Sequence, residues 1–90
     1  MLVLPAELTH DQAAACSRML AQALRGQSDP VVVADAGALE RFDSSALAVL
    51  LDCRREALAA GKGFAVARMP ARLRELASVY GVANLLPAPG

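Results

Sequence analysis

The sequence predicts a small α/β domain, because short β-branched runs alternate with longer segments of helical periodicity. Residues 31–35 form the clearest strand candidate, with three consecutive valines directly after a proline. Residues 9–26 and 45–61 instead repeat their apolar side chains at spacings of three and four. Strands alternating with helices favour a sheet covered by those helices, so we expect a mixed β-sheet under about three to four helices.

The first half of the chain supplies two strands and one helix. Residues 2–5 have the apolar character of a strand. Thr9 and Gln12 have the spacing of a capping box, which predicts that a helix begins there and runs to Gly26. The polar loop 27–30 then leads into the strand at residues 31–35.

The second half supplies two more helices and a strand at residues 64–67. The first of these helices ends at Gly61, and the second begins at Pro70, where the missing N–H costs little, and ends at Gly81. The stripe predicted to cover the sheet from the first helix contains Ala46, Leu47, Leu50, Cys53, Ala57 and Leu58, with Leu51 beside it. On the second helix, Leu73, Leu76 and Tyr80 are expected to face inward.

An acid and two hydroxyls precede the helix that starts near residue 45. Either Asp43 or Ser44 could cap the free N–H groups of the first turn, and the second hydroxyl, Ser45, would then face outward. The positive end of the helix dipole would favour a phosphate or an acceptor of a partner at this point. We therefore expect a partner-binding surface at Asp43, Ser44, Ser45 and the small residue Ala46.

This motif resembles that of the STAS domains, in which Asp-Ser-Ser or Asp-Thr-Gly precedes an apolar helix and follows a strand ending in Asp, here Asp35. Residues 61–66 are similar to the next turn and strand of the family. The pattern Leu-Ala-x-x-Tyr-Gly within residues 73–82, followed by Leu-Leu-Pro at residues 85–87, is similar to the end of the MlaB branch. The resemblance covers roughly residues 2–87 and implies one STAS domain over residues 1–90.

The resemblance also carries expectations about the fold edge and the site. STAS domains usually have a further strand before the one at residues 2–5, so we expect that edge to be shortened or completed by a partner chain. In the MlaB pattern a Thr at the position of Ser44 docks the ATPase partner. In the anti-sigma factor antagonists, the phosphorylated serine stands at the position of Ser45, and this chain has both hydroxyls.

Composition excludes several classes of function. Nine basic residues balance nine acidic ones, and the chain has three aromatic residues and no Trp, so a nucleic-acid partner is not expected. The hydrophobic fraction is 56%, but no apolar run approaches the roughly 18 residues that cross a bilayer. The N-terminus lacks the basic region of a secretory signal, which predicts a cytoplasmic protein.

The remaining reactive side chains do not form a recognisable catalytic set. Cys16 and Cys53 lie in helical segments without metal-ligand spacing, so we expect buried reduced thiols and no metal site. His10 is the only histidine and has no nearby second ligand. No phosphate-binding loop or paired nucleophile and base is present, so neither an enzyme nor a cofactor is expected. The four arginines that could form a basic partner-facing strip, or simply a solvated helix surface, are Arg54, Arg55, Arg72 and Arg74.

The leading hypothesis is a cytoplasmic, non-catalytic STAS subunit of an ABC transporter that moves phospholipids in a Gram-negative envelope and maintains outer-membrane lipid asymmetry. It would bind an MlaF-like ATPase and, through it, an MlaE-like permease and an MlaD-like substrate-binding subunit at the inner membrane. The alternative is an anti-sigma factor antagonist that is regulated by phosphorylation of Ser45. A STAS module of a sulfate transporter or stressosome-like assembly is a third hypothesis.

Overall fold

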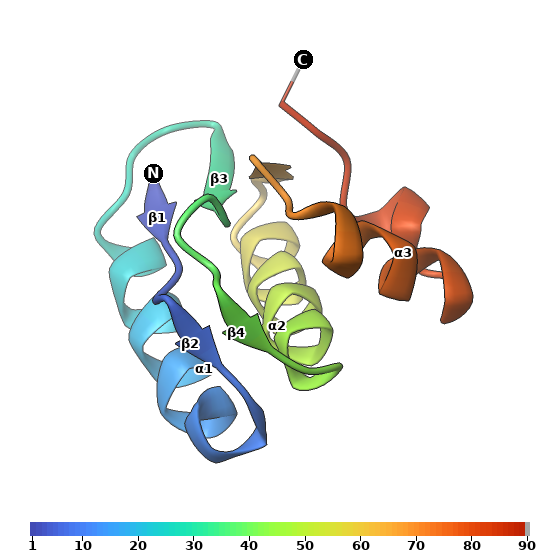
Figure 1. Cartoon of the computed structure of the whole chain (residues 1–90). Coiled ribbons are helices and arrows are strands. Elements are labelled where there is room, and N and C mark those ends of the chain that lie inside the picture. Colours follow the sequence, from blue (N-terminus) through green and yellow to red (C-terminus); the bar gives the residue numbers. More distant parts are fainter. Residues whose placement is uncertain (90) are drawn as a thin grey trace.

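A three-stranded parallel sheet and three α-helices form the framework of residues 1–89, the part of the chain that the computed structural model describes (Figure 1). The elements in order are β1 (Leu2–Val3), β2 (Glu7–Leu8), α1 (His10–Arg25), β3 (Val31–Asp35), β4 (Arg41–Phe42), α2 (Ser45–Ala59), β5 (Gly63–Ala67), α3 (Ala71–Val79) and the 3-10 turn η1 (Ala83–Leu85).

The central sheet has the strand order β1-β3-β5, and both of its ladders are parallel. Leu2 pairs with Ala34 in the first ladder, and Ala34 pairs with Val66 in the second. The α/β class is therefore confirmed, but the expected mixed strand directions are not found within residues 1–89. The reason is that α1 and α2 each return the chain to the same end of the sheet before the next strand starts.

The helices α1 and α2 pack side by side against one face of this sheet (Figure 1). The strand residues that face them are buried, as the alternation of a strand covered on one side requires. They are Leu2, Val32, Ala34, Phe64 and Val66. On the opposite face Val3 and Val31 are 61% and 46% exposed, whereas Ala65 and Asp35 are buried. The sheet and the helices α1 and α2 thus form two layers, and the core lies between them.

The predicted ends of α1 are confirmed. The backbone N–H and the hydroxyl of Thr9 both donate to Oε1 of Gln12, at 2.8 and 2.6 Å. At the other end, Gly26 N–H closes the last turn on the carbonyl of Ala23. The capping residues that sequence alone identified therefore do begin and end this helix.

Two inward-facing positions were predicted wrongly. Leu58 is 47% exposed, because it lies about 80° around α2 from the fully buried Leu50. Tyr80 is 60% exposed, because α3 ends at Val79 and the tyrosine lies beyond the core that Leu73 reaches.

A second, two-residue parallel pair joins β2 to β4, and the sequence did not predict it. Its register sets Glu7 opposite Arg41, whose side chains form an ion pair at 3.3 Å. The strand predicted at residues 2–5 ends early, because Pro5 has no N–H to donate to a ladder. The carbonyl of Ala6 then accepts hydrogen bonds from the backbone N–H groups of Glu40 and Arg41, at 2.8 and 3.0 Å, which starts the second pair.

An ion pair between the buried Asp35 and the exposed Arg68 ties together the ends of β3 and β5. The carboxylate of Asp35 accepts hydrogen bonds from Nε and Nη2 of Arg68 at 3.0 and 2.5 Å, and from the N–H of Gly37 at 2.9 Å. The guanidinium passes so close to Gly37 that a β-carbon there would lie 2.6 Å from Cζ. The backbone of Arg68 has a φ of 54°, in the left-handed region that residues other than glycine rarely adopt. These contacts hold the loop that leads from β3 to β4.

We expect this ion pair to make the stability of the domain sensitive to acid. The hydrogen bond from Arg68, followed by that from Gly37, lowers the pKa of Asp35. A lowered folded pKa means that the pair stabilises the fold above the ordinary aspartate pKa of about 3.9 and that this contribution is lost as pH falls through the folded value. Thermal melts at a series of pH values below neutrality should show a steeper loss for the wild type than for Asp35→Asn or Arg68→Met. Identical acid sensitivity in all three would contradict the assignment.

Candidate functional site

The β2–β4 pair brings the N-termini of α1 and α2 together at one point, occupied by Asp43. Its Oδ2 accepts a hydrogen bond from the backbone N–H of His10, at 3.1 Å, and its Oδ1 accepts one from the backbone N–H of Ser45, at 2.8 Å. One carboxylate therefore caps two helices, although Asp43 lies 33 residues after His10 in the sequence. The bond from Ser45 is the main reason that the pKa of Asp43 is lowered, with a smaller contribution from His10.

The first turn of α2 has already satisfied its own N–H groups. Besides the bond from Ser45 to Asp43, Ala46 N–H donates to the carbonyl of Asp43 at 3.1 Å, and Leu47 N–H donates to the carbonyl of Ser44 at 3.0 Å. Of the two candidate caps, Asp43 is thus the residue whose side chain accepts a hydrogen bond from the first turn of α2. The expectation that a phosphate or a partner's acceptor would be favoured here is corrected, because the N–H groups that would bind it are in use.

The three residues expected beside Asp43 have different environments. Ser44 is exposed, and its hydroxyl has no hydrogen-bond partner among residues 1–89. Ser45 is half-buried, and its hydroxyl lies close enough to Asp43 to help lower the pKa of that carboxyl group. Ala46 is fully buried in the core, so its expected place on the partner surface is corrected. Ser44 is the residue of the motif that presents a free polar group to solvent.

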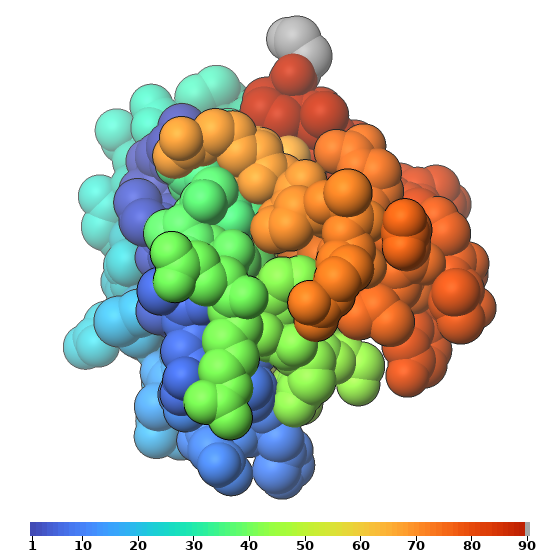
Figure 2. Space-filling view, in the orientation of Figure 1, coloured from blue at the N-terminus to red at the C-terminus, as the bar shows by residue number. Residues whose placement is uncertain are grey.

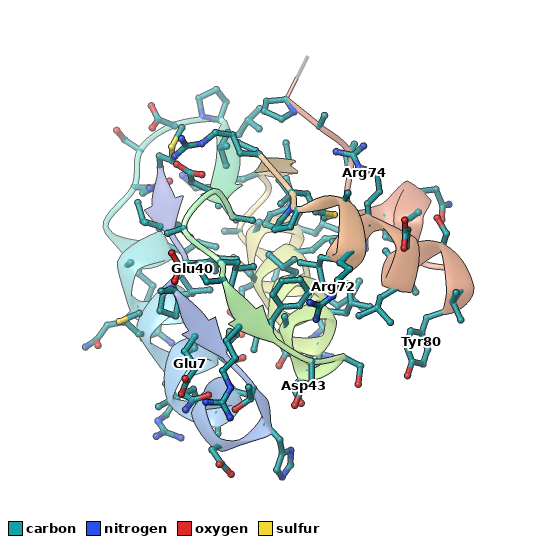
Figure 3. The ribbon with its side chains drawn as sticks, viewed as in Figure 1. Glu7, Glu40, Asp43, Arg72, Arg74 and Tyr80 are labelled. Carbon is teal, nitrogen blue, oxygen red and sulfur yellow. The ribbon has the colours of Figure 1, made fainter. Side chains whose placement is uncertain are left out.

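A groove of about 550 Å³ lies beside Ser44, between the start of α2 and the outer side of α3. We call this the α2–α3 groove. It is lined by Phe42, Asp43, Ser44, Arg72, Glu75, Leu76, Val79 and Tyr80. In Figure 2 the green segment that leads into α2 and the orange α3 meet on the visible face. In Figure 3 Asp43 and Tyr80 are labelled on these two sides of the site.

Sequence reasoning missed the α3 side of this groove. Tyr80 is 60% exposed, although it was expected to face inward, and Val79, to which no role was assigned, is 81% exposed. The spacing of Leu76, Val79 and Tyr80 at i, i+3 and i+4 describes a second apolar stripe next to the buried line of Leu73 and Ala77. That second stripe was the signal for the groove, because Leu73 and Ala77 alone already supply the buried face of α3.

Two of the four arginines that could form a basic strip lie in different surroundings. Arg72 lines the α2–α3 groove, where its Cζ lies 5.0 Å from the centre of the Phe42 ring. Arg55 instead forms an ion pair with Asp52 and lines a separate hollow between α1 and α2. Arg72 and Arg55 thus have different local partners on different parts of the described surface.

The cysteines are buried free thiols, as predicted. Burial raises the pKa of Cys16 and, with smaller effects from Cys16 and Glu56, raises the pKa of Cys53 to about 11. Such thiols are poor nucleophiles near neutral pH. Within residues 1–89, no cluster of three or more His, Cys, Asp and Glu side chains could hold a metal ion, and no helix is long and apolar enough to span a bilayer.

Comparisons with known proteins agree with the fold and the motif. The model of the protein family described as "Mlab, STAS domain" matches residues 1–87. A comparison with curated proteins finds no match. Because the family model covers nearly the whole sequence, the chain belongs to the STAS domain family, in the group described by that model.

Proposed function

We propose that the chain is a non-catalytic STAS subunit that binds and supports the ATPase of a phospholipid-transporting ABC complex, in the manner of MlaB. The observation that carries the proposal is the exposed Ser44 hydroxyl beside the α2–α3 groove, at the motif position where the MlaB pattern has its docking Thr. The match of the MlaB-type family model over residues 1–87 supports it. The MlaF-like ATPase would connect the subunit to an MlaE-like permease and an MlaD-like substrate-binding subunit.

The proposed action is thermodynamic. A subunit of this kind supports an ATPase only if it binds the active conformation more tightly than the inactive ones. The groove and Ser44 offer a shaped surface for such binding, and the thiols are unsuited to nucleophilic chemistry. On this proposal the protein acts on the cytoplasmic side of the inner membrane, held there by the transporter, and maintains outer-membrane lipid asymmetry.

The alternative, an anti-sigma factor antagonist, requires phosphorylation of Ser45. A phosphate there would add about 1.5 to 2 negative charges at neutral pH, next to the carboxylate of Asp43. The N–H groups that could offset this charge at the start of α2 are already bonded. The added charge would therefore disturb the start of α2, as a switch requires, and our preference for the transporter subunit rests on the match of the family model described as "Mlab, STAS domain".

We expect the protein purified from its own host to carry the ATPase with it and to lack a phosphate on Ser45. Ser45→Ala should leave the complex intact, because the Asp43 cap uses the backbone N–H of residue 45, which alanine retains. Affinity purification with intact-mass measurement tests both statements. A major phosphorylated species mapped to Ser45, together with a serine kinase in place of the ATPase, would establish the alternative.

A further inference from the structure

The outer side of α3 offers an apolar surface to the α2–α3 groove. Val79 and Tyr80 are 81% and 60% exposed, and Leu76 is half-buried beneath them. Large apolar side chains that line one groove at such exposure are typical of a binding surface. Tyr80 adds a hydroxyl at the end of the stripe, which suits a partly polar interface. The groove therefore has a site for an apolar anchor of a partner.

The charges around this surface are not equivalent. Arg72 is placed over the ring of Phe42, at 5.0 Å from its centre, so its cation already has a partner within the domain. Asp43 is occupied by the N–H groups of His10 and Ser45. Glu75 is exposed at the groove and has no ion-pair partner among residues 1–89. Among the charged residues that line the groove, the two carboxylates of Asp43 and Glu75 thus outnumber the single cation of Arg72, and Glu75 is the carboxylate without a hydrogen-bond partner in the described residues.

We propose that the groove binds an amphipathic segment of the partner that carries an apolar anchor and, close to it, an arginine or lysine paired with Glu75. This inference rests on the proposed function, because it describes the segment by which the ATPase docks. The apolar anchor fills the space over Leu76 and Val79, and the Ser44 hydroxyl hydrogen-bonds at the other wall. An acidic segment is disfavoured, because it would meet the carboxylates of Glu75 and Asp43.

The test compares charge changes on two neighbouring positions of α3 in the full chain. Glu75→Arg should weaken binding of the purified ATPase at least about tenfold, and Glu75→Gln should reduce the salt dependence of the dissociation constant. Arg74→Glu is the matched control, since Arg74 is exposed on α3 but does not line the groove, and Figure 3 shows it pointing away from Asp43. Its dissociation constant should remain within about twofold of the wild-type value.

The outcomes separate this inference from the proposed function. Unchanged or tighter binding by Glu75→Arg, while Ser44→Arg still blocks the complex, would show that the partner segment is not basic and would leave the proposed function standing. Failure of the wild-type chain to bind the ATPase would overturn both. Circular dichroism melts of each variant should match the wild type, because Glu75 and Arg74 are exposed and neither side chain forms an ion pair within residues 1–89.

Discussion

Leu50→Ala should destabilise the domain by about 2–5 kcal/mol, the range measured for buried leucines that are truncated in a packed core. Leu50 is 0% exposed and lies at the centre of α2, on the side that covers the sheet. The substitution removes apolar contacts and leaves a cavity that the neighbouring strands fill only in part. For a domain of this size, a loss of 2 kcal/mol lowers the melting temperature by roughly 8 to 16 °C.

Leu58→Ala provides the matched control on the same helix. Leu58 is 47% exposed, so its truncation should change stability by no more than about 0.5 kcal/mol. Chemical unfolding of both variants gives the two free energies directly. Equal effects of the two substitutions would mean that α2 is rotated relative to the sheet, since sequence periodicity alone had placed both residues in one stripe.

The main elements could be predicted because their signals are local. The valines of β3 and the capping pair Thr9 and Gln12 act within a few residues, and both gave elements with the expected bounds. Gly61 and Gly81 also follow their helices with φ values of 75° and 72°, which glycine adopts without strain. Residue propensity and capping motifs are sufficient to predict an element where neighbours in sequence determine its backbone conformation.

The short β2–β4 pair could not be predicted, because two-residue strands have no periodicity to detect. Its hydrogen bonds join residues more than 30 positions apart, as in the bonds from Glu40 and Arg41 to Ala6. The same holds for the bidentate contact between Asp35 and Arg68. Such pairings depend on how the finished sheet brings distant segments together.

The start of α2 was predicted from the sequence, whereas the partner-binding role of its residues stays a prediction. Sequence identified the start of α2, where Asp43 and Ser44 do lie, but left the capping residue open. The structure assigns the cap to Asp43 and moves Ala46 into the core. The second wall of the groove, with Val79 and Tyr80, was missed, although the spacing of Leu76, Val79 and Tyr80 was a local signal for it.

Ser44→Arg should abolish stable complex formation with the ATPase while leaving the fold intact. The side chain of Ser44 is exposed at the groove, so an arginine there would project into the space that the partner must fill. The backbone of Ser44 has φ −62° and ψ −16°, which any residue adopts, and its hydroxyl does not cap the helix. Steric exclusion at the centre of an interface typically costs more than 2 kcal/mol, or over about thirtyfold in affinity.

Ser28→Arg separates this local effect from the general effect of an added positive charge. Ser28 is also exposed, but it lies in the loop between α1 and β3, at the opposite end of α2 from Ser44 (Figure 1). A helix of 15 residues is about 22 Å long, so this arginine cannot reach the groove. Co-purification with the ATPase should therefore persist for Ser28→Arg and be lost for Ser44→Arg, with equal melting temperatures. If the Ser44 variant retains the complex, the partner binds elsewhere, and if only Ser28→Arg loses it, the interface lies at the other end of the domain.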